Sequence, residues 1–101
     1  MTQIARLQKA IRDLHGLEST HDRSEPVHET FQGETAWEGV VEVFTVYGHS
    51  KARLAYAWSH ETDPGGLRYV AVLGVPPVNS AQDAVRASIA SEAQRAKGGQ
   101  A

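Results

Sequence analysis

The spacing of apolar residues predicts an amphipathic helix at the N-terminal end of the chain. Apolar side chains recur there every three or four residues, with charged residues between them, and this period is typical of a helix that buries one face. Gly16 follows, and glycine commonly ends a helix. We therefore expect a helix over residues 1–16, with an apolar stripe formed by Ile4, Leu7, Ile11 and Leu14.

A second helix is predicted near the C-terminal end. Ser80 and Asp83 have the spacing of a capping box, with the shorter acid in the glutamate position. A narrow stripe of mostly small residues follows at helical spacing, which would let the helix lie close to a sheet. The expected helix covers residues 80–96, and residues 97–101 are expected to form a tail. The stripe consists of Ala81, Ala84, Val85, Ile89 and Ala93.

The middle of the chain has the composition of strands. Valine, threonine and aromatic residues are frequent there, and glycine and proline clusters mark turns. The polar residues 17–26 are expected to form a loop. Because strands joined by short turns are antiparallel neighbours, the predicted fold is one α+β domain over residues 1–101: a four-stranded antiparallel meander over 27–75, with both helices packed on one face. The expected strands are 27–31, 35–47, 52–62 and 67–75.

The turn lengths also predict the register of the strands. They place Tyr47 opposite Ala52, and Thr62 opposite Leu67. Alternate side chains of each strand then lie on the same face, and one face collects most of the large rings and little charge. We expect this face to be the core beneath the helices, formed by Trp37, Val41, Val43, Tyr56, Trp58 and Leu73.

The second face of the predicted sheet is the candidate binding surface. It holds an apolar strip with charged residues around it, and exposed apolar patches of this kind mark contacts with partners. The favoured function is therefore a non-enzymatic protein-interaction domain that acts through this open face. The partner is another protein or a second copy, stacked face to face as a homodimer. The predicted interaction face consists of Val40, Glu42, Phe44, Val46, Arg53, Val70 and Val72.

Two other functions stay open. If the aromatic face were uncovered, its rings could stack on single-stranded nucleic acid, although 10 basic and 12 acidic residues provide no basic patch. Alternatively, an enzyme could use the end of the sheet that carries Glu38, Glu61 and His60, with Glu38 opposite Glu61. An enzyme would need a deep pocket near Trp37. No phosphate loop, dinucleotide fingerprint or nucleophile elbow is present, so an enzyme is not the favoured function.

Composition narrows the remaining chemistry. The chain has no cysteine, which excludes disulfides, thiolate catalysis and cysteine-based zinc sites. The triplet His-Glu-Thr occurs at 28–30 and at 60–62, but the two predicted strands are separated by a third and so lie about 10 Å apart. We expect no metal and no cofactor. No apolar run approaches the ~20 residues of a membrane span, and no signal peptide is recognisable, so a cytoplasmic protein is expected.

One string of the sequence is distinctive. The run PVHETFQGETAWEGVVEVF, followed by YAWSH and later by VPPV, resembles a group of short uncharacterised bacterial proteins. The resemblance covers about half of the chain. It implies a bacterial origin, among mobile or accessory genes, and it implies no known activity, cofactor or functional residue.

Overall fold

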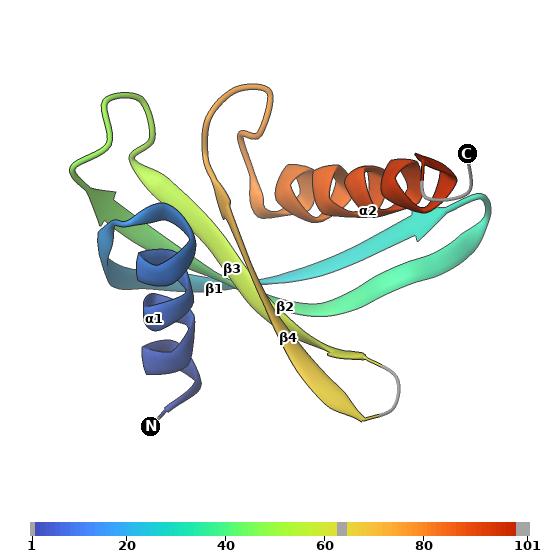
Figure 1. The fold of residues 1–101 in the computed structure, drawn as a ribbon, viewed down its shortest axis with the longest axis horizontal. Helices are drawn as coiled ribbons and strands as arrows, with labels where there is room; N and C mark the ends of the chain where they lie inside the picture. Colours follow the sequence, from blue (N-terminus) through green and yellow to red (C-terminus); the bar gives the residue numbers. More distant parts are fainter. Residues whose placement is uncertain (1, 63–64, 99–101) are drawn as a thin grey trace.

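The computed structural model of the chain describes residues 2–62 and 65–98, with the backbone alone for residues 31, 62 and 92–98. A helix, four strands and a second helix follow one another along the chain (Figure 1). The strands form one antiparallel sheet in the order β1-β2-β3-β4, which confirms the predicted α+β meander. The elements are α1 (Gln3–His15), β1 (Glu18–Phe31), β2 (Glu34–Tyr47), β3 (Leu54–Thr62), β4 (Gly66–Leu73) and α2 (Ala81–Gly98).

Most of the predicted ends of the helices are confirmed. Gly16 adopts the left-handed conformation (φ 70°) and donates its N–H to the carbonyl of Arg12 at 2.8 Å, as expected of a helix-ending glycine. At the start of α2, the Asp83 N–H donates to the Ser80 hydroxyl at 3.1 Å. The expected tail is wrong at residues 97–98, which continue α2, and residues 99–101 and the side chain of Ala93 lie outside the described part.

The loop predicted over residues 17–26 is wrong at residues 18–26, which form the larger part of β1. They pair with residues 40–47 of β2, and the rest of β1 pairs with the rest of β2. β1 has a neighbour on one side only, and charged, proline-containing sequences are usual in such edge strands. These residues therefore form a strand because they pair with the apolar β2, and their own polar composition does not predict one. The two-residue turn that follows, Gln32 (φ 54°) and Gly33 (φ 82°), confirms the predicted turn.

The predicted register between β2 and β3 is confirmed, whereas that between β3 and β4 is wrong by one residue. Thr62 lies opposite Gly66, not Leu67. Since a slip of one residue moves every side chain of a strand to the other face, Val70 and Val72 lie on the same face as the tryptophans. The turn predicted at residues 63–66 falls partly on residues 63–64, which lie outside the described part.

The two helices cover opposite faces of the sheet, so the prediction that both pack on one face is wrong. α2 covers the face with the large rings, where the buried residues are Val27, Val41, Val43, Tyr56, Trp58, Ala81, Ala84 and Val85. α1 covers the other face, where the buried residues are Leu7, Ile11, Leu17, Phe44, Val46, Ala52, Ala55, Ala57 and Ala71. Leu73 packs with the second group, and Leu14, predicted to be core, is 59% exposed.

The two β-hairpins diverge at one end of the sheet. Among the described residues, the β2–β3 ladder runs from Glu42 to Thr45, against Leu54 to Ala57. On the Glu42 side, each strand continues to pair with its hairpin partner beyond that point. Figure 1 shows the strands of the β1–β2 hairpin and those of the β3–β4 hairpin running in different directions away from the middle of the sheet. None of the described helices is long and apolar enough to cross a membrane.

Candidate functional site

The predicted interaction face is not an open surface. Phe44 is 0% exposed and Val46 is 5% exposed beneath α1, while Val70 and Val72 lie on the opposite face, partly buried near α2. Alanines at 55, 57 and 71 leave room for α1 to approach the sheet closely. Of the apolar strip, only Val40 remains largely exposed, at 51%. The expected homodimer by stacking of this face therefore has no surface to form on.

Glu42, a residue of the predicted interaction face, has its hydrogen-bond partners within the chain. Its Oε1 accepts hydrogen bonds from Nε2 of His21, at 2.8 Å, and from the hydroxyl of Ser24. Both residues lie on the neighbouring strand β1. Within the described residues no hydrogen bond joins Ser24 to His21, so the three side chains lack the nucleophile–base contact that covalent catalysis requires. Arg53 is exposed and lies away from this group, near the turn before β3.

A cleft lies where the two hairpins part. Its larger part, an open hollow of about 640 Å³, is lined by β2, β3, the first turns of α1 and Leu67 of β4. A smaller part, about 90 Å³, lies on the other side of the sheet against Val85, Ser88 and Ile89 of α2. Trp37 and Trp58 line both parts. The tryptophan pair therefore stands between two hollows on opposite faces of the sheet.

The two tryptophans form the aromatic wall of the cleft. Their ring centroids are 5.8 Å apart and their planes are inclined by 50°. Trp58 is 3% exposed, and Trp37 is partly buried. A Cβ added at Gly39 would lie 2.9 Å from the Trp37 ring, so the absence of a side chain at Gly39 lets this ring lie across its own strand. A glycine within a valine-rich strand is a signal of such close approach, and this signal is present in the sequence at Gly39.

The polar lining of the larger part is acidic. It contains Glu38 and Glu42 from β2 and Glu61 from β3, and no lysine or arginine belongs to it among the described residues. Glu38 and Glu61 have no hydrogen-bond or ion-pair partner in the described part of the chain. The predicted pairing of Glu38 with Glu61 does not form, because the β2–β3 ladder ends at Glu42. The two carboxylates lie on opposite walls.

The structure also brings Gln3 to the cleft, which the sequence did not indicate. Its side-chain amide donates to the hydroxyl of Ser59 at 2.8 Å and so ties the beginning of α1 to β3. His60 lines both parts of the cleft. The end of the sheet considered for an enzyme, with Glu38, Glu61 and His60, therefore coincides with the cleft.

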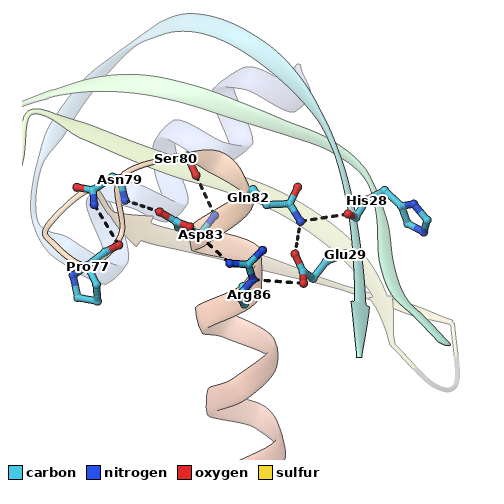
Figure 2. A network of polar contacts seen from close by, with 8 residues as sticks. All are labelled: His28, Glu29, Pro77, Asn79, Ser80, Gln82, Asp83 and Arg86. Atoms are coloured by element: carbon cyan, nitrogen blue, oxygen red, sulfur yellow. Dashed lines mark hydrogen bonds and ion pairs between the residues drawn. The ribbon is translucent and has the colours of Figure 1, made fainter. Parts of the chain in front are cut away.

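A separate polar network fixes α2 to β1 (Figure 2). Glu29 is 8% exposed. Its carboxylate accepts hydrogen bonds from the Gln82 amide and from Nε of Arg86, the latter at 3.3 Å. The Gln82 amide also donates to the carbonyl of His28. Because these bonds connect β1 to the first turns of α2, they hold the helix that closes the smaller part of the cleft.

The aromatic platform for single-stranded nucleic acid is wrong as a structural prediction. Tyr56 and Trp58 are 2% and 3% exposed beneath α2, so bases have no access to their faces. As for metals, the described residues contain no group of three or more histidine, cysteine or acidic side chains placed to hold an ion.

The displaced pKa values resolved in the described part lie outside the cleft lining. The hydrogen bonds that the Arg23 guanidinium donates to the carboxylates of Asp22 and Glu25 raise the pKa of Arg23 above its ordinary value. Burial raises the pKa of Tyr56. The cleft is therefore defined by its shape and charge.

Comparison of the chain with protein-family models, with curated proteins and with solved structures finds no match. The resemblance to short bacterial proteins stays a prediction. The function has to be inferred from the geometry of the cleft itself.

Proposed function

We propose that this chain is a non-enzymatic binding domain whose ligand site is the cleft between the two hairpins. The observation that supports this most directly is the parting of the sheet beside Trp37 and Trp58. The hollow of about 640 Å³ falls within the ~300–1,000 Å³ typical of ligand pockets. The proposal keeps the predicted class of function and moves its site from the sheet face to the cleft.

The walls of the cleft are held by different parts of the fold, which favours a preformed site. α2 is fixed to β1 by the Glu29 network, and the start of α1 is tied to β3 by Gln3. A site that is already in its binding conformation loses less entropy when the ligand arrives. A protein partner remains the class we favour, because backbone edges as well as side chains border the cleft.

An enzyme that uses Glu38, Glu61 and His60 is the second candidate, since all three line the cleft. General acid–base catalysis needs groups within hydrogen-bond reach of the reacting atoms. In the described part, however, no side-chain hydrogen bond joins any two of the three, and Nδ1 of His60 is 3.3 Å from the backbone carbonyl oxygen of Glu61. Binding without turnover is therefore the simpler proposal.

The test is a selection of ligands from a random peptide display library on the whole protein. We expect enriched peptides to shift the amide NMR signals of residues 36–40 and 58–61. Trp37→Ala, at a partly buried position, should weaken their binding at least tenfold. Leu14→Ala removes an apolar side chain that is exposed outside the cleft and should leave binding unchanged.

A second groove, of about 490 Å³, lies between α1 and β4, where Ala10, Leu14 and Tyr69 line it. Ligands that shift the NMR signals of this groove instead, or binding that survives Trp37→Ala, would contradict the proposed site. Sedimentation of the unliganded protein at micromolar concentration tests the other partner class. A dimer that dissociates on Trp37→Ala would identify the cleft ligand as a second copy of the chain. Conversion of a selected peptide into a product would favour the enzyme.

A further inference from the structure

We infer that the cleft takes an extended peptide segment in which basic residues alternate with small apolar ones. This inference rests on the proposed function and specifies its ligand. Three features of the cleft support it: the orientation of the backbone along its two walls, the distribution of charge between its two sides, and an unpaired donor on Trp58.

The backbone of both walls is arranged to receive a strand. The Val46 N–H donates to the carbonyl of Arg53 at 2.9 Å, and hydrogen-bonded pairs recur at every second residue of an antiparallel ladder. By this alternation, the backbone groups of Val40 and Glu38 turn toward β3. No strand pairs with β2 on that side beyond Glu42 within the described residues.

The opposite wall has the same property. Ser59 and Glu61 follow the same alternation on β3, and the described residues of this segment pair with β4 alone. A peptide laid between the two walls could hydrogen-bond to both, which is the mode of recognition known as β-strand addition. On β2 the four residues from Glu38 to Val41 lie beyond the end of the β2–β3 ladder and span about 13 Å.

The two sides of the cleft differ in charge and size, which predicts an alternating ligand. Glu38, Glu42 and Glu61 share the face covered by α1, where the hollow is about 640 Å³ and can hold long side chains. Since Glu42 already bonds to His21 and Ser24, Glu38 and Glu61 remain to pair with a cation. Successive side chains of a strand point to opposite faces, so every second residue of the ligand should be lysine or arginine.

The residues between these should be small and apolar. On the face covered by α2 the hollow is only about 90 Å³ and is lined by Trp37, Val85 and Ile89 among others. A valine or alanine side chain fits such a space, and a long charged one does not. On the face covered by α1, the carboxylates would repel the phosphates of a nucleic acid, which excludes nucleic acid as the ligand.

Trp58 supplies an independent sign that a ligand belongs in the cleft. Although 3% exposed, its indole N–H has no acceptor among the described residues. In the described part, the fully buried side-chain atom without a partner is Ser19 Oγ. The Trp58 N–H is therefore not fully buried, and the residue that carries it lines both hollows. An indole N–H is a donor only, and a peptide carbonyl is a suitable acceptor.

The test uses four synthetic heptapeptides with blocked ends. The first is Thr-Lys-Val-Lys-Val-Lys-Thr, and two others carry glutamine or glutamate in place of each lysine. The fourth, Thr-Lys-Lys-Lys-Val-Val-Thr, has the composition of the first without its alternation. Binding is measured by tryptophan fluorescence and amide NMR at low and at physiological salt.

We expect the alternating lysine peptide to bind tightest and its glutamate version at least tenfold more weakly, with the difference shrinking as salt rises. Glu38→Gln and Glu61→Gln should each weaken binding of the lysine peptide about two- to fivefold, as expected for a partly exposed ion pair. Glu34→Gln removes an exposed carboxylate of the same strand outside the cleft and should have no effect.

Each other outcome overturns the inference in a recognisable way. Equal binding of the lysine, glutamine and glutamate peptides at the cleft would refute the basic ligand and leave the proposed binding site standing. Equal binding of the alternating and block peptides would refute the strand-like arrangement. If no heptapeptide binds but display-selected ligands occupy the cleft, the inference alone fails. If neither kind of ligand reaches the cleft, the proposed function fails with it.

Discussion

The two faces of the sheet are packed in opposite ways. Beneath α2 the sheet contributes the large side chains, such as Tyr56 and Trp58, and the helix contributes small ones, such as Ala84. Beneath α1 the helix contributes Leu7 and Ile11, and the neighbouring strands contribute mainly alanines around Phe44. Protein interiors are packed as densely as organic crystals, so each face reaches that density by a different division of volume between sheet and helix.

This difference shows that small side chains on a sheet face do not by themselves indicate solvent. Alanines at 55, 57 and 71 mark the place where a helix with large side chains lies close. The two helices also differ in their polar attachments. The Glu29 network attaches α2 to β1. On the other face, a hydrogen bond between Nε2 of His15 and the carbonyl oxygen of Ala71, at 2.8 Å, attaches α1 to β4.

The largest expected effect comes from a charge placed beneath α1. Phe44 is 0% exposed, so Phe44→Arg would bury an unpaired guanidinium among apolar groups, which costs more than a marginally stable domain can lose. We expect loss of the folded state by circular dichroism. Val40→Arg lies on the same face of the same strand at a position that is 51% exposed and should remain folded. A folded Phe44→Arg protein would mean that this face is open after all.

The ring face beneath α2 should show the next largest effect. Trp58→Ala removes a side chain that is 3% exposed and leaves a cavity, which should lower the free energy of unfolding by about 3–5 kcal/mol. Chemical denaturation measures the change. A loss below about 1 kcal/mol would show that α2 does not pack on this face.

The sequence predicted the parts of the fold that depend on local signals. The helices, the glycine after α1, the Gln32–Gly33 turn and the β2–β3 register all follow from residues close to one another in the chain. Residues 27–31 of β1 were predicted as a strand, but residues 18–26 escaped prediction because they are polar and become a strand through their pairing with β2. The β3–β4 register depended on a four-residue turn that allows two alignments, and the wrong choice reversed the face of every β4 side chain.

The sequence predicted several residues of the candidate site but not the cleft that they line. Glu38, Glu61 and His60 were singled out from the sequence, but as neighbours in a continuous sheet. What creates the cleft is the end of the β2–β3 ladder at Glu42, and a break in pairing between distant strands leaves little trace in local composition. The local signal of the cleft in the sequence is Gly39, which accommodates the Trp37 ring.

The contrast between the middle and the last turn of α1 gives a third prediction. Leu7 is 0% exposed and Leu14 is 59% exposed, although both belong to the same apolar stripe of the sequence. Leu7→Ala should lower the free energy of unfolding by about 2–5 kcal/mol, and Leu14→Ala by no more than about 0.5 kcal/mol. Urea denaturation of the two variants decides the matter, and equal losses would mean that the last turn of α1 is covered in solution.

The smallest expected effect concerns the hydroxyl of Tyr56, a residue buried on the sheet face that α2 covers. Burial raises the pKa of Tyr56 above its ordinary value of 10.0, so the unfolded chain loses this proton at a lower pH than the folded one. Above pH about 10 the folded state then binds more protons, and stability falls as pH rises. Tyr56→Phe should lose less stability between about pH 9 and pH 11 than the wild-type protein, measured by urea denaturation. Tyr47→Phe, at a ring that is 53% exposed, should retain the wild-type slope. An unchanged slope in Tyr56→Phe would mean that the phenol is as well solvated when folded as when unfolded, and the α2 face would then be as open to water at Tyr56 as the surface at Tyr47.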